Sequence, residues 1–165
     1  MRERQARSRL AVAVAIAAMC FVAADWPCFR GPKSSGASDD VAGPTRWTAT
    51  DAVLWKTALP GFGASSPITW QGRVFVTSYN GYGLDEDHPG GQEDLRIQLT
   101  ALNLSDGSVA WAREIEPAIP EQDYRGFLAI HGYASGTPAT DGERVYVAAG
   151  RSGVLAFTMA GRPVW

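Results

Sequence analysis

Short apolar runs, each closed by glycine, proline, asparagine or aspartate, fill the chain from Val53 onward. The runs are four to seven residues long and rich in β-branched and aromatic side chains, which is typical of strands bounded by turns. No segment after residue 24 carries a convincing helical stripe, and the stretch 120–130, interrupted by Gly126, predicts a turn or two of helix at most. The pattern therefore predicts an all-β chain. The expected strands are 53–57, 66–70, 73–78, 97–104, 108–115, 137–140, 144–149, 154–158 and 163–165.

Residues 1–24 have the pattern of a secretory signal peptide. Four arginines precede an apolar run over 10–24, and the run ends in the small residues Ala23 and Ala24. A membrane span needs roughly 20 apolar residues, so this run is short for one. Two alternatives stay open: an uncleaved anchor, and lipid attachment at Cys20, whose preceding residues match a lipidation signal poorly. If cleavage follows Ala24, Cys28 is the only cysteine left and has no partner for an internal disulfide.

Residues 25–52 are rich in glycine, proline, serine and aspartate and show neither a strand nor a helix period. We expect an extended N-terminal segment there. Its large aromatic side chains Trp26, Phe29 and Trp47 are the candidates for fixing it onto the rest of the protein.

The strongest signal is an internal repeat. Trp55, Trp111 and Trp165 each close a similar strand, and they stand 54 to 56 residues apart. Within each period a small-Pro-apolar-Thr strand is followed by a glycine turn and an Arg-Val-aromatic-Val strand, at 66–76 and again at 137–147. The repeated order predicts a repeated hairpin.

A second repeated unit runs from a strand through a polar turn into the strand that ends in tryptophan. It occupies 101–111 and, one residue shorter, 156–165. Asp-Gly favours a tight turn because glycine accepts a positive φ without a steric cost. Alanine leaves space beneath a large ring, and the tryptophan then offers an apolar face to a neighbouring unit.

Four strands in each period of this length are typical of a β-propeller blade. The string Ala-x-Asn-x-x-x-Gly-x-x-x-Trp at 101–111 resembles the tryptophan-docking motif of the pyrroloquinoline-quinone-like (PQQ-like) β-propeller repeat family, and 25–32 resembles the start of exported bacterial members. The second copy of the motif is weaker, because Thr158 replaces the amide and one position is lost. The resemblance implies a quinoprotein-like propeller of four-stranded antiparallel blades, eight in a complete protein, with each tryptophan packing on the next blade. The docking residues it implies are Ala101, Asn103, Gly107, Trp111, Ala156, Gly161 and Trp165.

Only about two blades fit into 53–165, whereas a propeller needs at least about four to close. We therefore interpret the sequence as a fragment of a longer propeller. The alternative is a short protein that assembles with copies of itself.

Charge narrows the classes of partner. Without residues 1–24 the chain keeps 11 basic and 16 acidic residues, and this acidic balance without a basic stripe argues against nucleic-acid binding. Lys33 and Lys56 are the only lysines, which argues against a polybasic lipid-binding patch and leaves the N-terminal signal or anchor as the only expected membrane contact.

Three groups of polar residues are candidate sites, but we assign none of them as catalytic, cofactor-binding or metal-binding. The acidic cluster Asp85–His88 suits a hard cation, but its spacing matches no calcium loop, and a solvated surface loop is the preferred interpretation. His131 is interpreted as structural at the entry to a strand. Turn serines at 65, 66 and 135 lack the Gly-x-Ser-x-Gly elbow of a hydrolase.

The preferred functional hypothesis is a non-catalytic, exported propeller module of the periplasm or cell envelope. It would act as a protein-interaction scaffold through the loops 79–96 and 116–134, toward an unidentified protein partner. By repeat type, the functional analogue is the propeller lipoprotein of the outer-membrane barrel assembly machinery.

Two alternatives remain open. One is a fragment of a quinone (PQQ)-dependent dehydrogenase, although the chain has no adjacent cysteines and no aspartate that matches that family's base, so neither PQQ nor calcium is assigned. The other is a carbohydrate-binding propeller that would use Trp47, Trp70 and Tyr82 as platforms.

Overall fold

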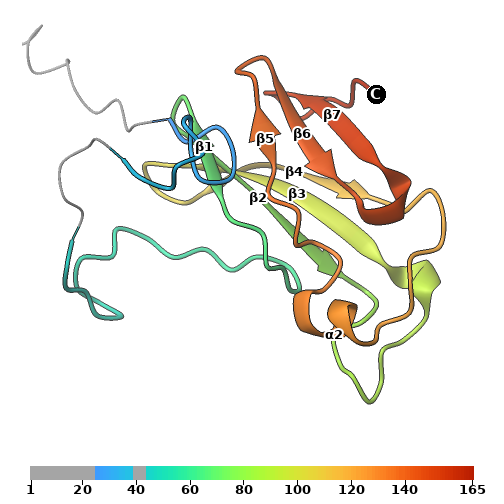
Figure 1. Ribbon diagram of the computed structural model, residues 1–165. Helices are drawn as coiled ribbons and strands as arrows, with labels where there is room; N and C mark the ends of the chain where they lie inside the picture. Colours follow the sequence, from blue (N-terminus) through green and yellow to red (C-terminus); the bar gives the residue numbers. More distant parts are fainter. Residues whose placement is uncertain (1–24, 39–43) are drawn as a thin grey trace, which may run out of the picture.

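The computed structural model describes residues 25–38 and 44–165, so the predicted signal peptide at 1–24 lies outside the described residues. Two antiparallel sheets dominate, and the predicted all-β class is confirmed (Figure 1). The first sheet has the order β1-β2-β3-β4 and the second β5-β6-β7. The strands are β1 (Ile68–Trp70), β2 (Arg73–Asn80), β3 (Arg96–Asn103), β4 (Val109–Ile115), β5 (Ala139–Thr140), β6 (Arg144–Ala148) and β7 (Val154–Thr158). The short helices are η1 (Gln92–Asp94), α2 (Phe127–His131) and η2 (Gly150–Ser152).

Each sheet begins with the hairpin that the repeat predicts. Trp70 pairs with Arg73 across a turn whose two residues, Gln71 and Gly72, both have positive φ. The hairpin of β5 and β6 pairs Ala139 with Tyr146 and Thr140 with Val145, so its turn is longer, with Gly142 at positive φ. These turns lie at the upper end of Figure 1, whereas the long connections after β2 and β4 lie at the lower end (Figure 1). We call these two ends the hairpin end and the loop end.

The core lies between the two sheets. Alternate residues of β2 and β3, such as Phe75 and Leu99, face the second sheet, and Val145, Val147 and Phe157 face back. All five are buried, and burying each side chain contributes about 1.5–3 kcal/mol. The two sheets therefore pack face to face, and each buries the face that is turned toward the other.

Two predicted strands differ from the structure. No strand forms at 53–57, where Leu54 is 93% exposed, because a strand needs a backbone partner as well as a suitable composition. The segment 163–165 runs beside β7 but is too irregular to count as a strand. Its pairing consists of the Val164 N–H bonding to the Ala156 carbonyl and the Ala156 N–H bonding to the Trp165 carbonyl, each at 2.8 Å.

The N-terminal aromatic residues behave differently from one another. Trp26 forms a backbone bridge with Thr69 of β1, but Phe29 and Trp47 are exposed and do not fix the segment to the sheets. The predicted turn or two of helix is the five-residue α2.

Candidate functional site

The repeat tryptophans contact the turns one period further along the chain. The indole Nε1–H of Trp55 donates to the Leu104 carbonyl at 2.8 Å, and a Cβ added to Gly107 would stand 2.3 Å from the Trp55 ring. Two residues later, the Thr57 hydroxyl donates to the Gly107 carbonyl at 2.6 Å. A ring face and two hydrogen bonds therefore hold this strand-like segment on the turn between β3 and β4.

The next tryptophan repeats the arrangement. Trp111 Nε1–H donates to the Met159 carbonyl at 3.1 Å, and a Cβ at Gly161 would stand 2.7 Å from its ring. Arg113, again two residues after the tryptophan, donates from Nε to the Gly161 carbonyl at 2.5 Å. Thr57 and Arg113 were not identified as docking residues from the sequence. The one feature that could have indicated them is a side-chain hydrogen-bond donor two positions after Trp55 and Trp111.

The other expected repeat residues take separate positions. Ala101 and Ala156 are fully buried in the core. Asn103 donates from Nδ2 to the Ser108 hydroxyl at 2.7 Å and accepts a hydrogen bond from Arg73.

Where the second copy of the unit has Thr158, the threonine hydroxyl accepts from the Arg162 N–H at 3.1 Å. Asn103 and Thr158 therefore each stabilise the turn of their own repeat unit. Trp165 is 63% exposed and lies 6.0 Å from Tyr146 between ring centroids, much as Trp111 lies 5.9 Å from Phe75.

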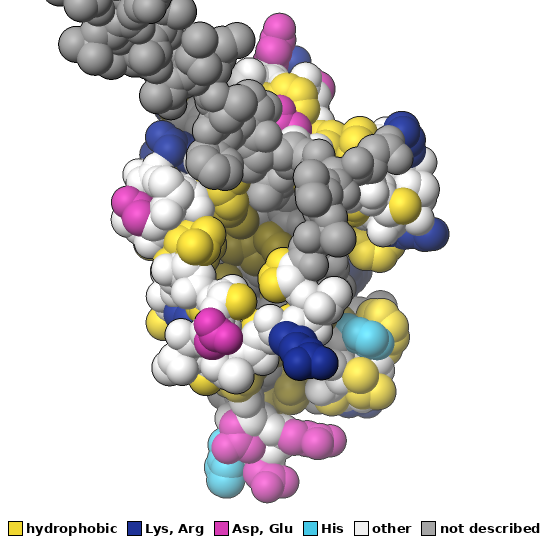
Figure 2. All heavy atoms as spheres, turned by 90° about the vertical axis from the view of Figure 1, so that its left-hand side faces the viewer, with side chains coloured by type: hydrophobic (Ala, Val, Ile, Leu, Met, Phe, Trp, Pro, Cys, Tyr) yellow, Lys and Arg dark blue, Asp and Glu magenta, His cyan; other side chains and the backbone are white. Residues whose placement is uncertain are grey.

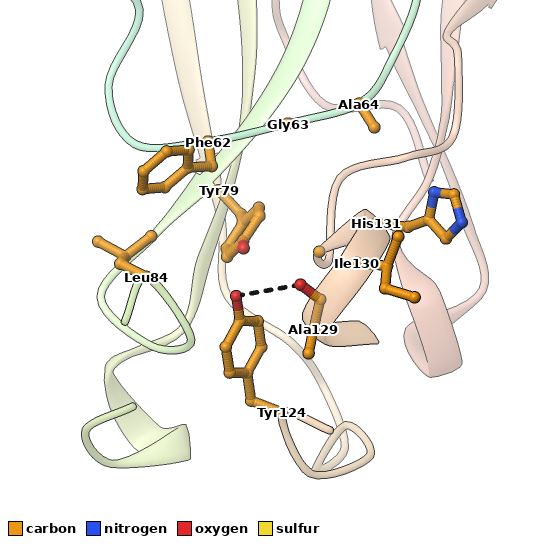
Figure 3. Close-up of a pocket in the computed structure, with 10 residues that line it drawn as sticks. Phe62, Gly63, Ala64, Tyr79, Leu84, Tyr124, Ala129, Ile130 and His131 are labelled. Atoms are coloured by element: carbon orange, nitrogen blue, oxygen red, sulfur yellow. Dashed lines mark hydrogen bonds between the residues drawn. The ribbon is translucent and has the colours of Figure 1, made fainter. Parts of the chain in front are cut away.

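A hollow of about 300 Å³ opens at the loop end, where the two long connections meet (Figure 3). Phe62 and Leu84 stand on one side of it, and Ile130 and His131 on the other, with Tyr79 and Tyr124 between them (Figure 3). The hollow is also lined by Gly63, Ala64, Ala129 and Gly132.

Four tyrosines under and beside this hollow join the loops to one another. Their rings contact at centroid distances of 5.4 to 6.4 Å, which suits edge-to-face and tilted aromatic packing. The four are Tyr79, Tyr82, Tyr124 and Tyr133.

All four hydroxyls bind main-chain groups of the loops, and the Tyr124 hydroxyl donates to the Ala129 carbonyl at 3.5 Å (Figure 3). Tyr79 donates to the Gly83 carbonyl at 2.8 Å, and Tyr133 donates to the Gln122 carbonyl at 2.8 Å. The Tyr82 oxygen accepts from the Tyr124 N–H at 3.0 Å. Because each bond ends on the backbone, the cluster fixes the course of the loops themselves.

Burial changes the acidity of this cluster. Burial, reinforced by Tyr124, raises the pKa of Tyr79 to about 12, and burial also raises the pKa of Tyr133. Both phenols therefore keep their hydrogen atoms for the loop carbonyls at alkaline pH values where an ordinary tyrosine ionises.

The connection after β4 is also tied to the second sheet. The buried Glu121 accepts the Arg151 N–H at 2.7 Å, and Arg151 donates to the Pro120 carbonyl at 2.8 Å. The Ser152 hydroxyl accepts the Ala118 N–H at 2.8 Å. The loop end is therefore built as one connected surface.

The rim of the hollow is apolar and exposed. Phe62, Leu84 and Ile130 line the hollow and are each at least 40% exposed, and Ile130 reaches 78%. Scattered exposed apolar residues are ordinary, but a group of them around a hollow on a fixed surface is typical of a binding surface. We call these three residues the loop-end rim.

Acidic side chains crowd the tip of the loop end (Figure 2). Asp85 accepts the N–H groups of Asp87 and His88 through its own carboxylate, as an Asx turn does, so the cluster holds its own loop. Within 25–38 and 44–165, no three His, Cys, Asp or Glu side chains gather in a way that could hold a metal ion.

The contacts of His131 and Ser65, two further polar candidates, indicate their roles. His131 is exposed at the end of α2, 4.3 Å from the Phe127 ring. Ser65 exchanges hydrogen bonds with the backbone of Thr77, at 3.0 and 3.1 Å, and so extends the pairing of β2. This serine is structural.

The residues suggested as carbohydrate platforms do not form one surface. Trp47 is exposed, but Trp70 is half-buried and Tyr82 is only 7% exposed, because both rings pack between elements. The expectation of three exposed platforms was wrong.

Comparisons with known proteins agree with this architecture. Among the described residues, no helix has the length and apolar character to cross a membrane. No curated protein matches the chain. The family described as Outer membrane protein assembly factor BamB matches residues 42–165, which include both sheets and the loop end. The chain therefore belongs to this family of PQQ-like β-propeller repeat proteins.

Proposed function

We propose that this chain is a non-catalytic PQQ-like propeller module of the cell envelope and that it acts as a protein-interaction scaffold. The observation that carries the proposal is the loop-end rim, an exposed apolar group around a hollow whose walls the tyrosine cluster fixes. A surface that is ordered before binding loses little conformational entropy when a partner arrives, so more of the contact energy appears as affinity.

The charge of the loop end supports a particular kind of partner segment. Asp85, Glu86 and Asp87 are exposed beside the rim, and Arg96, the first residue of β3, is already paired with Glu114 at 3.4 Å. Charged side chains at the edge of an interface mainly speed the encounter of the two proteins and select the partner, whereas buried apolar side chains supply affinity. A polypeptide segment with an apolar anchor and flanking basic residues suits this surface.

The repeat residues have a supporting role in the proposal. Trp111 on Gly161, with Arg113 beside it, would hold one blade in register on the next, which keeps the two connections of the loop end side by side. In this role Ala101, Asn103, Gly107, Ala156 and Trp165 are structural, and the proposal assigns neither a quinone nor calcium to the chain. The family description names an assembly factor of outer-membrane proteins, which supports export and a position at the envelope.

Site-specific photo-crosslinking in cells tests the proposal. A photoreactive residue in place of Ile130 should give one defined protein adduct, identified by mass spectrometry. The same residue in place of Phe29, which is also exposed, at 60%, but lies on the N-terminal segment, should not.

Adding Phe62→Asp should abolish the Ile130 adduct, because an ionised carboxylate on the rim opposes apolar contact. Adducts that are the same from both positions, or that survive Phe62→Asp, would overturn the loop end as the binding surface.

A further inference from the structure

The N-terminal segment lies across the first strands of both sheets. Trp26 and Thr69 of β1 exchange two backbone hydrogen bonds, N–H to carbonyl at 2.8 Å and the reverse at 3.0 Å. The next carbonyl, of Pro27, accepts the Thr140 N–H of β5 at 2.8 Å. Two consecutive residues therefore bind the free edges of two different sheets.

This arrangement places the two edges close together. A dipeptide spans about 7 Å at most, so β1 and β5 converge where Trp26 and Pro27 lie. The Thr77 hydroxyl also donates to the Gly136 carbonyl just before β5, at 3.0 Å. Because propeller blades converge toward a central channel, we assign β1 and β5 to the axial side of the blades.

The segment also makes contacts within itself and with the turn between β1 and β2. The Asp25 carboxylate accepts the Gln71 N–H at 2.7 Å, at the turn between β1 and β2. The Trp26 ring covers Gly31 so closely that a Cβ there would stand 2.8 Å from three ring atoms. Arg30, at φ 64, donates from its side chain to the Ser35 carbonyl at 2.9 Å. The segment thus combines internal contacts with a bond to the first sheet.

We propose that residues 25–36 are an axial cap, a turn-rich segment of the same chain whose residues Trp26 and Pro27 occupy the inner edges of both blades and close the axial side at the hairpin end. A free edge strand presents unpaired N–H and carbonyl groups on which another chain can add. The cap forms hydrogen bonds with such backbone groups at Thr69 and Thr140. Pro27 has no N–H, so the outer side of the cap is a poor template for a further strand.

Amide hydrogen exchange followed by NMR on the whole chain tests the cap. In the unaltered protein the Thr69 and Thr140 amides should exchange at least about tenfold more slowly than exposed loop amides, because both donate to the cap. Fast exchange of the Thr69 and Thr140 amides, together with slow exchange of the Phe75 amide in the core, would overturn the proposal. This result needs no substituted protein.

Trp26→Pro removes the N–H that Thr69 accepts and disturbs the bridge. Exchange at Thr69 and Thr140 should then rise about tenfold while Phe75 stays protected. Phe29→Ala, in the same segment but without a bond to either strand, should leave both rates unchanged. Unchanged rates in Trp26→Pro would contradict the cap, and equal rises in Phe29→Ala would show a general loosening instead.

Discussion

Trp111 lies flat against Gly161, and its indole N–H donates to the carbonyl of Met159 in the same turn. Trp55 stands in the same relation to Gly107, so each tryptophan contacts the glycine one repeat further on. The contact leaves no room for a side chain, and both glycines also have positive φ. Glycine is therefore required twice over at these turns, by backbone conformation and by the ring.

Replacement of Gly161 by alanine should destabilise the protein more than an ordinary turn substitution. Strain at positive φ costs about 1 kcal/mol, and overpacking against the Trp111 ring adds about 1–3 kcal/mol. Gly72→Ala is the matched control, because Gly72 has φ 74 against 77 for Gly161 but no atom within 4 Å of the added Cβ. Denaturant unfolding should give a loss of about 2–4 kcal/mol for Gly161→Ala and about 1 kcal/mol for the control. Equal losses would show that the ring contact contributes nothing.

Arg113→Ala should also weaken the contact between the sheets. The substitution leaves the buried Gly161 carbonyl without the Arg113 donor, which costs about 1–2 kcal/mol of unfolding free energy. Arg162→Ala removes an exposed arginine three positions earlier than Trp165 and should change stability by about 0.5 kcal/mol or less. Arg113→Lys should recover only part of the loss, since lysine lacks the Nε–H. A full recovery would mean that charge alone matters.

Local pattern was enough to predict most of the sheets. Phe75, for example, stands between Val74 and Val76, so short β-branched and aromatic runs bounded by turn residues predicted the strands. Segment 53–57 has the same composition but forms no strand, because strand formation depends on a partner that local composition does not encode. The glycine and tryptophan spacing showed the repeat, whereas the donors Thr57 and Arg113 became visible only through the contact itself.

The loop end was less predictable. The two long connections were expected to carry partner binding, but nothing in the sequence joins Tyr82 to Tyr124, 42 positions apart. Their contact depends on how the sheets place both connections at one end. The inner-edge position of Trp26 is a long-range contact of the same kind, since its partner Thr69 lies 43 positions away.

At acidic pH the hairpin of β5 and β6 should lose a stabilising contact. The Tyr146 hydroxyl donates to Asp141 at 2.6 Å, and the Arg144 and Glu143 N–H groups also bind this carboxylate, which together lower the pKa of Asp141 to about 2. Its pKa in the unfolded chain is near 3.8, so the contribution is fully present above that pH and is lost as the pH falls through 2.

Tyr146→Phe should therefore raise the pKa of Asp141 toward 3.8 in a carboxyl-carbon NMR titration. Asp106, whose pKa is lowered by Ser108, serves as the internal control and should not shift. An unchanged Asp141 titration would show that the backbone N–H groups alone hold the carboxylate.

At alkaline pH the tyrosine cluster should control stability. Tyr79 ionises near 10 in the unfolded chain, whereas burial raises its folded pKa to about 12, so its contribution is complete below pH 10 and disappears as the pH rises through 12. Tyr79→Phe cannot ionise, and its unfolding free energy should fall less steeply across this range. At neutral pH the variant should be about 1 kcal/mol less stable, because the Gly83 carbonyl loses its donor. The pKa of Tyr133 is also raised, so a reduced slope should remain. Urea unfolding at pH 7 and between pH 10 and 12 measures both effects, and an unchanged alkaline slope would mean that Tyr79 ionises in the folded loop end as freely as in the unfolded chain.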